Sequence, residues 1–189
     1  MEPLKRICRD VVDVFQGKKP AVHRYWDDKN VKHIDILSCE DSPTQGIVSY
    51  ATLGLSQIDF GWTSQQKSLR TELIGTCCSE TTYFPQILSA AAFEIMNSGA
   101  GVPGAVLRNI ISLYVPETTT PHLFLTMPSM WQKELLPISF DDIMVDFLMV
   151  VPISDTEWRF LNQQGEEALE SLLEEKQVHI HDFFRKPIG

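Results

Sequence analysis

The sequence predicts an α+β fold, in which a largely antiparallel central sheet of about six strands is covered by N-terminal, middle and C-terminal helices. Two observations predict it. Segments whose apolar residues recur every three or four positions are separated by short runs of strand character, and most of those runs are joined by short turns. The sequence contains no internal repeat, low-complexity segment or long linker. We therefore expect residues 1–189 to form one domain.

The first two of the three expected helices lie at the start and in the middle of the chain. Apolar residues recur at helical spacing across residues 4–15, and Gly17 followed by Pro20 ends that helix. The same spacing returns at residue 84, where Pro85 suits a first turn, and Gly99 supplies a stop. This second helix is rich in apolar residues and is expected to be largely buried.

The third helix is expected to begin at a capping box. Ser154 is placed to accept a hydrogen bond from the amide of Glu157, while the Glu157 carboxylate accepts one from the amide of Ser154. Apolar residues then continue at intervals of three and four to about Glu175. Gly165 falls on this apolar stripe, which predicts a close approach of two backbones there.

The strands are expected from runs rich in apolar and β-branched residues between turn signals. Residues 143–151 are dense in such residues, as is typical of a strand buried on both faces, so this strand is expected to be central. The expected strands span residues 31–37, 47–55, 69–78, 106–115, 122–127, 143–151 and a short closing strand within 178–183.

The charge of the chain excludes several classes of function. The sequence has 16 Lys and Arg against 25 Asp and Glu, a net charge of −9. A protein that grips nucleic acid needs a basic surface, so direct nucleic-acid binding is not expected. The apolar run at 143–153 is interrupted by Asp146 and is shorter than the roughly 20 residues that a membrane helix needs. No secretory signal peptide is recognisable, which favours the cytoplasm.

The acidity is concentrated in one stretch. Residues 134–175 contain 11 acidic residues and one basic residue, Arg159, giving a local charge of −10. A solvated helix face is one interpretation of such a stretch. The other is a docking surface for a basic partner, because opposite potentials accelerate encounter.

Motifs that resemble catalytic or cofactor sites lack the context that their chemistry needs. Residues 99–104 match G-x-G-x-x-G, but a helix precedes the loop and a strand follows it, so no helix N-terminus would face a pyrophosphate. Cys77 and Cys78 are expected to be buried, and His179 and His181 to form an edge-strand pair lacking a third metal ligand. We expect no enzymatic activity, no cofactor and no metal, with a hydrolase using His and Asp residues as the least favoured alternative.

Several ordered segments resemble the suppressor-of-fused (SUFU) domain family, over about residues 20–187. Toward the C-terminus, Glu157, Gly165 and Arg185 also match the strand and helix that close this domain. The matching segments in the first half are Tyr25-Trp26-Asp27-Asp28, His33-Ile34-Asp35-Ile36-Leu37, Ser49-Tyr50-Ala51-Thr52-Leu53-Gly54-Leu55-Ser56 and Arg70-Thr71-Glu72-Leu73.

The resemblance implies a binding protein. The family includes long animal signalling regulators and short bacterial proteins, and this chain resembles the short kind, which is similar to immunity proteins of LXG-type and related toxin systems. The resemblance implies a non-enzymatic cytoplasmic antitoxin, which binds and neutralises a cognate secreted toxin. That toxin is expected to be a basic nuclease. The alternative that the resemblance leaves open is a peptide-binding or scaffold module acting on a host regulator. The oligomeric state is not predicted.

If the acidic stretch forms the interface, its exposed carboxylates occupy a positive groove of the toxin as phosphate mimics, and a nearby aromatic residue anchors the contact. The residues predicted to bind the partner are Trp131, Phe140, Asp141, Asp142, Glu166, Glu167, Glu170, Glu174 and Glu175. Arg70 and Glu72 share a strand face and are expected to form an ion-pair arrangement on the sheet. The alternative for Arg70 is that its face lines a groove for a partner peptide.

Overall fold

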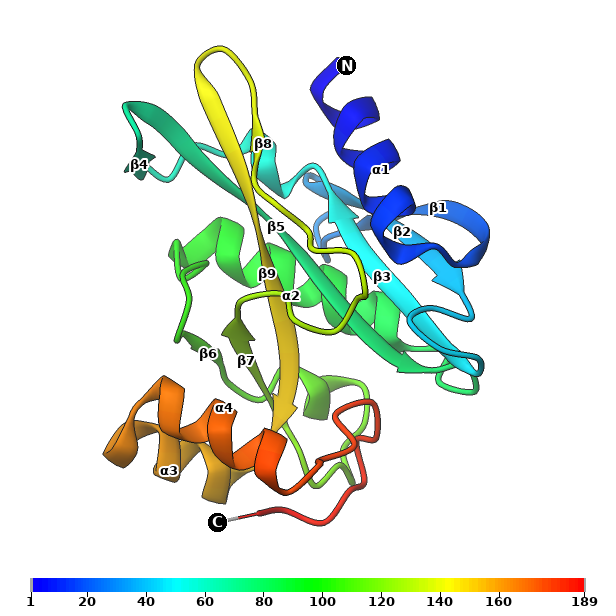
Figure 1. Ribbon diagram of the computed structural model, residues 1–189, viewed down its shortest axis with the longest axis vertical. Helices are drawn as coiled ribbons and strands as arrows, with labels where there is room; N and C mark the ends of the chain where they lie inside the picture. Colours follow the sequence, from blue (N-terminus) through cyan, green and yellow to red (C-terminus); the bar gives the residue numbers. More distant parts are fainter. Residues whose placement is uncertain (1, 189) are drawn as a thin grey trace.

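A computed structural model describes residues 2–188 and places one large sheet at the centre of the molecule (Figure 1). Within these residues there are four α-helices and nine strands, and the sheet order is β1-β2-β3-β5-β9-β7-β6, with β4 beside β5 and β8 beside β9. The helices are α1 (Glu2–Phe15), α2 (Phe84–Ser98), α3 (Asp155–Gln164) and α4 (Glu166–Glu175). The strands are β1 (Lys18–Trp26), β2 (His33–Glu40), β3 (Ile47–Leu53), β4 (Thr63–Ser64), β5 (Lys67–Cys78), β6 (Val106–Leu107), β7 (His122–Thr126), β8 (Ile138–Ser139) and β9 (Ile143–Ile153).

The two longest strands, β5 and β9, lie side by side in the sheet. They pair in parallel from Ser68 opposite Ile143 to Ile74 opposite Met149, whereas every other strand pair is antiparallel among the residues described. A parallel pair needs a long crossover connection, and here that connection contains α2 and the β6–β7 hairpin. The predicted α+β class and the interior position of the 143–151 strand are confirmed.

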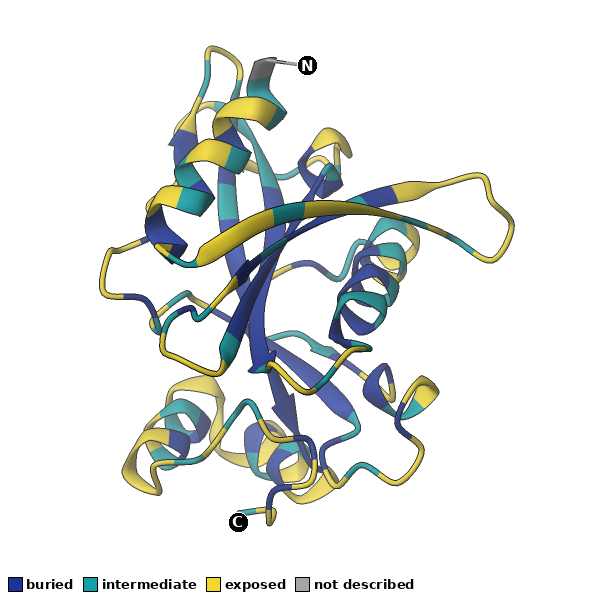
Figure 2. Cartoon of the chain, turned by 90° about the vertical axis from the view of Figure 1, so that its right-hand side faces the viewer, coloured by how far each residue is buried: buried dark blue, intermediate teal, exposed yellow. Residues whose placement is uncertain are grey.

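Helices cover both faces of this sheet. On one face α2 packs over a core that includes Leu73, Phe84 and Val150. On the other face α1, α3 and α4 pack over a second core that includes Ile74 and Phe147. Figure 2 shows the strands in the middle of the sheet buried along most of their length and the outer faces of the helices exposed. No helix within residues 2–188 combines the length and the apolar character that a membrane crossing requires.

The middle helix begins and ends where the sequence predicts. Pro85 lies in its first turn, and Gly99 adopts a left-handed conformation with φ 71°, donating its amide to Ile95 at 2.8 Å. At Gly75 of β5, a Cβ atom would lie 2.6 Å from Val150 and 2.9 Å from Phe84. The absence of a side chain at Gly75 therefore lets α2 lie close against the sheet.

The predicted third helix is interrupted. Its capping box is confirmed, with the Glu157 amide donating to Ser154 Oγ at 3.2 Å and the Ser154 amide donating to Glu157 Oε2 at 2.8 Å. However, Gly165 has φ 89° and ψ 172°, a conformation that is essentially restricted to glycine, and it separates α3 from α4. A Cβ there would meet no atom within 4 Å, so the predicted close backbone packing at Gly165 is wrong.

Replacing Gly165 with alanine is expected to lower the free energy of unfolding by about 1–2 kcal/mol, because an L-residue is strained at this φ. Urea unfolding followed by circular dichroism measures the change. A Gly165→Ala protein as stable as wild type would contradict the conformation described.

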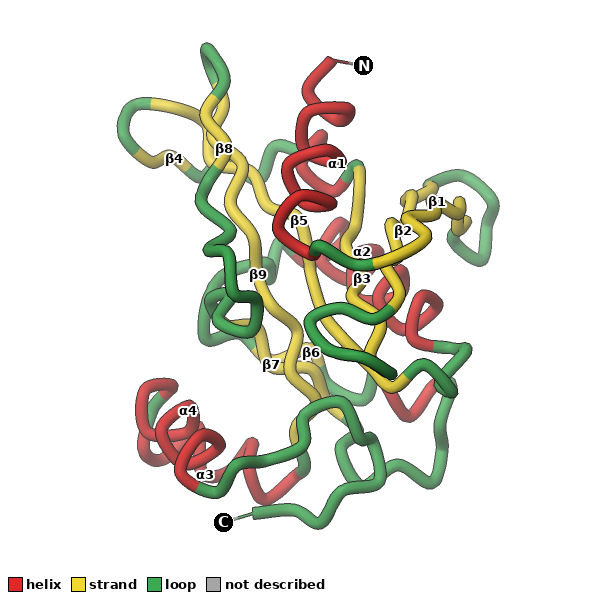
Figure 3. The backbone as a smooth tube through the Cα atoms, turned by 45° about the vertical axis from the view of Figure 1, so that its right-hand side comes forward, coloured by secondary structure: helices red, strands yellow, loops and turns green. Residues whose placement is uncertain are grey.

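Three further expectations at the strand level are wrong. The 106–115 strand shrinks to β6 followed by a 3-10 turn at Ile111–Leu113, and β1 forms an edge strand that the stop signal at Pro20 concealed. Pro20 is compatible with an edge because no neighbour needs its amide. Residues 178–183 form a loop with turns (Figure 3), in which the Ile180 amide donates to the Val178 carbonyl and the Asp182 amide to the His179 carbonyl.

Candidate functional site

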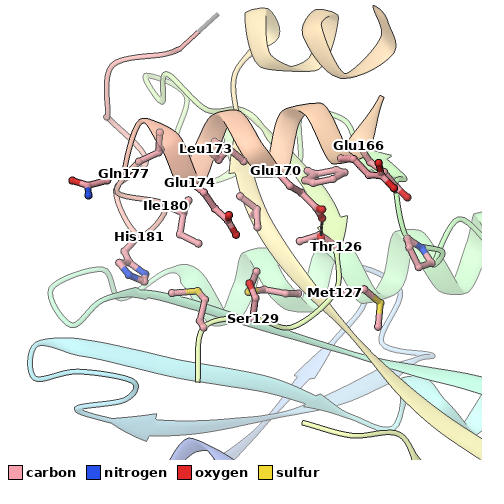
Figure 4. A pocket seen from close by; sticks show the side chains of 17 residues that line it. Thr126, Met127, Ser129, Glu166, Glu170, Leu173, Glu174, Gln177, Ile180 and His181 are labelled. Atoms are coloured by element: carbon pink, nitrogen blue, oxygen red, sulfur yellow. Dashed lines mark hydrogen bonds between the residues drawn. The ribbon is translucent and has the colours of Figure 1, made fainter. Parts of the chain in front are cut away.

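A groove of about 550 Å³ lies between α4 and strands β7 and β9 (Figure 4). Its floor is apolar, with Phe124 from β7, Met149 and Val151 from β9, and Leu173 from α4. Met127, which is 49% exposed, lies at its margin. The groove thus combines a large concave surface with apolar lining, which is the usual form of a binding site.

Four of the predicted carboxylates line this groove. Glu166, Glu170 and Glu174 recur every four residues and therefore follow one side of α4, and Glu167 lies beside them. Leu169 and Leu173 of the same helix are buried in the core and hold it against the sheet. Figure 4 shows Glu170 directed toward Thr126, whose hydroxyl donates to its carboxylate.

No positive side chain offsets these carboxylates within the groove lining described for residues 2–188. The one basic side chain there is that of His181, whose Nδ1 lies 2.7 Å from the hydroxyl of Thr76. Burial, together with the neighbouring His179, holds the pKa of His181 below its usual value of 6.5. The imidazole is therefore neutral at pH 7, and the groove carries a net negative charge.

The rest of the predicted acidic surface lies elsewhere. Phe140, Asp141 and Asp142 are in the turn between β8 and β9, at the opposite end of the molecule from α4 (Figure 1). There Arg6 lies over the Phe140 ring at 5.1 Å, and Lys67 donates to the Phe140 carbonyl. The idea of one continuous acidic face is therefore wrong, because β9 separates the two groups and two cations accompany the second.

Two other predicted residues do not line the groove. Trp131 is only 8% exposed, stacks on Phe15 with ring centroids 5.1 Å apart, and donates from Nε1 to Ser49 Oγ at 2.9 Å. Its ring belongs to the core and does not line the groove, so its role as an aromatic anchor stays a prediction that the burial of the ring does not favour. Glu175 is exposed and pairs with Lys176 at 3.1 Å, beside the groove but outside its lining.

Two candidate catalytic side chains, those of His122 and Cys77, are engaged or protonated. His122 Nδ1 accepts a hydrogen bond from the Asn109 amide at 3.0 Å, so Nε2 carries the proton and donates to Asp155 Oδ1 at 3.2 Å. Neither ring nitrogen is free to act as a base. Burial raises the pKa of Cys77 to about 12, so this thiol is not a nucleophile at pH 7.

The glycine-rich loop at residues 99–104 and the two histidines near the C-terminus do not form a cofactor or metal site among the residues described. The predicted order of helix, loop and strand around residues 99–104 is confirmed by α2 and β6. His179 and His181 lie in the loop that follows α4 and not on an edge strand, which corrects the expectation. Within residues 2–188, no three His, Cys, Asp or Glu side chains are grouped as metal ligands would be.

Glu72 is fully buried and makes no ion pair with Arg70, so the expected pairing is wrong. Its carboxylate instead accepts hydrogen bonds from the hydroxyls of Thr52 and Ser56 and from the amides of residues 54–56, at 2.6–3.2 Å. This arrangement fixes the turn that follows β3. The SUFU-like segments at 49–56 and 70–73 thus meet in space through Glu72.

Arg70 turns to a different partner. Its Nη2 lies 2.9 Å from Asp59 Oδ2, and its side chain is 12% exposed. Asp59 comes from the loop between β3 and β4, which sequence spacing does not connect to Arg70. The alternative that the Arg70 face lines a peptide groove stays a prediction.

The apolar floor of the groove was not predicted. Met127 and Met130 come from the segment after β7, and Met149 comes from β9, so only the folded sheet brings them together. A sequence signal exists for the rim alone, namely the four-residue spacing of the glutamates in α4. In the sequence, the pattern around the floor residues predicts only ordinary buried positions.

Comparison with known proteins gives a consistent assignment. Residues 30–186 match the family model described as Suppressor of fused protein (SUFU). The chain is 38% identical over 185 residues to "Immunity protein YqcF" of Bacillus subtilis (strain 168), which covers 97% of this chain and 96% of that protein.

Solved structures agree in fold. A putative SUFU homologue from Neisseria gonorrhoeae FA 1090 superposes with a TM-score of 0.72 at 17% identity, covering 97% of this chain and 94% of that one. Drosophila Suppressor of Fused gives a TM-score of 0.68 at 14% identity, covering 96% of this chain and 48% of that one. A chain from a Sufu–Fu complex gives a TM-score of 0.70 at 15% identity, covering 98% and 89%. The chain described here belongs to the suppressor of fused protein (SUFU) family.

Proposed function

We propose that this chain is a cytoplasmic immunity protein that binds a cognate toxin and neutralises it without catalysis. The name of the Bacillus subtilis relative, an immunity protein at 38% identity over nearly the whole chain, supports this role. The observation that carries the proposal is the groove in which four glutamates border an apolar floor. Its negative charge attracts a basic partner, and its apolar floor provides a contact from which water is excluded.

A basic nuclease is the toxin class that the groove suits best. A nuclease binds phosphate through a positive surface, and carboxylates held on a helix present negative charge in its place. Glu166, Glu170 and Glu174 are fixed on one side of α4 because Leu169 and Leu173 anchor that helix. Binding at this surface would exclude nucleic acid from the nuclease by occupying its phosphate site.

Reversing two α4 charges, Glu167→Lys with Glu174→Lys, is expected to weaken toxin binding about ten- to hundredfold. Both side chains are exposed, so folding is preserved. The double variant should also show a weaker dependence of affinity on salt, because fewer attractive charges are screened. Isothermal titration calorimetry at ionic strengths of about 0.01 and 0.15 M measures both effects.

The matched control is Asp141→Lys with Asp142→Lys, which changes net charge by the same amount at the β8–β9 turn. We expect it to change affinity less than threefold. An equal loss for the two double variants would indicate a nonspecific effect of net charge, and a larger loss at residues 141–142 would place the interface at that turn.

The runner-up function is a peptide-binding or scaffold module. It is favoured by the fold similarity to a chain that was crystallised in a Sufu–Fu complex. Co-expression separates the two functions, since an immunity protein restores growth to cells that express its cognate toxin. A scaffold would leave those cells unprotected.

A further inference from the structure

We infer that the groove beneath α4 receives a basic amphipathic helix of the partner, with the apolar side of that helix seated on the floor and its Lys and Arg residues against the α4 glutamates. The inference rests on the proposed function only in taking the helix to be a segment of the toxin. The groove itself, its lining and its charge are features of this chain.

The floor offers an adaptable apolar contact. Three of the six methionines of the chain, Met127, Met130 and Met149, line the groove together with Phe124 and Val151. Methionine side chains are unbranched and polarizable, so a surface rich in them fits helices of varied shape. Grooves that combine such a floor with a charged margin bind amphipathic helices through anchors spaced three and four residues apart.

The charge of the margin selects the sign of the helix. Glu166, Glu167, Glu170 and Glu174 line the groove, and the His181 ring adds no positive charge at pH 7. A helix with acidic residues beside its apolar stripe would meet like charges along α4. A helix with Lys and Arg in those positions meets opposite charges, which raises both its rate of association and its specificity.

The backbone of the floor favours a helix over an added strand. In β9, residues 149–153 pair with β7 along one edge, and residues 143–149 pair with β5 along the other. The outer edge of β7 is occupied at Leu125, whose amide donates to Ala105 at 2.9 Å and whose carbonyl accepts from Gly104 at 2.8 Å. Where β9 and β7 are paired, the floor presents side chains, and side-chain surfaces bind helices that have satisfied their own backbone hydrogen bonds.

The length of α4 sets the size of the occupant. A helix of 10 residues extends about 15 Å, so a partner helix lying along it contacts the groove over about three turns. Apolar residues at positions i, i+3, i+4 and i+7 provide anchors over that distance.

A designed peptide tests the inference without the toxin. The probe is an amidated Leu/Lys peptide of about 14 residues with leucines at i, i+3, i+4 and i+7, compared with a scrambled peptide of the same composition and a Leu/Glu peptide of the same pattern. We expect the Leu/Lys helix to bind at least tenfold more tightly than either comparison peptide. Equal binding of the scrambled peptide, or no binding of the Leu/Lys helix at millimolar concentration, would overturn the inference.

Methionine methyl NMR locates the bound peptide. With ¹³C-methyl methionine, we expect the signals of Met127, Met130 and Met149 to shift, while those of Met96 and Met144, which are outside the groove lining, stay in place. The internal comparison requires no mutation, so it is insensitive to folding defects. Shifts at Met96 or Met144 without shifts in the groove would place the peptide elsewhere.

Filling the groove provides the functional test with the toxin. Ser129 is an exposed residue of the lining, and Ser129→Trp is expected to weaken toxin binding at least tenfold. The control Ser171→Trp adds the same ring to an exposed position of α4 outside the lining, with little effect expected. If wild type binds the toxin and Ser129→Trp binds equally well, the groove inference fails while the proposed function stands. If wild type does not bind the toxin, the proposed function fails, and the peptide and NMR results decide the groove separately.

Discussion

Replacing Arg185 with methionine is expected to lower the free energy of unfolding by about 3–5 kcal/mol, because it leaves the Glu157 carboxylate buried without its cation. Arg185 donates from both terminal nitrogens to Glu157, at 2.6 and 2.8 Å, and also to the Pro152 carbonyl at 2.8 Å. Arg185 is 6% exposed and Glu157 is fully buried. This pair fastens the C-terminal segment to the start of α3.

The pH dependence of this contribution has a defined sign. Burial alone would raise the pKa of Glu157, but hydrogen bonds from Arg185, Ile188 and Ser154 hold it below its usual 4.5. The folded protein therefore binds fewer protons than the unfolded chain in this range. The stabilisation is fully present above about pH 4.5 and is lost as the pH falls through the folded pKa.

The measurement is urea unfolding of wild type and Arg185→Met at pH values from about 7 down to 3. The difference between their free energies of unfolding reports the contribution of the Glu157–Arg185 pair at each pH. We expect the difference to shrink as the pH falls. Lys176→Met, at an exposed surface pair, is the control and should cost less than about 1 kcal/mol. A difference between wild type and Arg185→Met that stays constant with pH would contradict the assigned pair.

Glu72→Gln is expected to lower the free energy of unfolding by about 3 kcal/mol or more, because an amide nitrogen would then face buried donors. Both carboxylate oxygens of Glu72 accept hydrogen bonds from backbone amides, so neither position suits an NH₂ group. Burial raises the pKa of Glu72 against the hydrogen bonds of Thr52 and Ser56, which favour the ionised form.

Urea unfolding of Glu72→Gln, with the exposed Glu80→Gln as control, measures this effect. A double-mutant cycle with Ser56→Ala separates the hydrogen bond from the rest of the site, since Ser56 Oγ donates to Glu72 at 2.7 Å. Ser56→Ala should cost less in the Glu72→Gln background than in wild type. Full additivity of the two substitutions would show that Glu72 and Ser56 do not interact.

Local rules predicted the elements that local interactions determine. The capping box at Ser154 and Glu157 and the limits of α2 at Pro85 and Gly99 depend on residues a few positions apart. The break at Gly165 was not predicted, because an apolar stripe continues across it and helical spacing alone does not report φ. The edge strand β1 was concealed by Pro20, which local propensity reads as a stop.

Long-range contacts determined what the sequence could not show. Glu157 was recognised as a capping residue, but its partner Arg185 lies 28 residues later. The α4 glutamates were predicted as partner-binding residues from charge alone, and that role stays a prediction. The groove floor beneath them depends on the pairing of β7 with β9, which no spacing rule supplies.

The most direct measurement is the binding of purified chain to a candidate cognate toxin, paired with growth of cells that express that toxin with or without the chain. The proposed function predicts a tight complex, restored growth, and loss of both in the Glu167→Lys, Glu174→Lys variant. Cells that stay unprotected and a toxin that does not bind would contradict the immunity role.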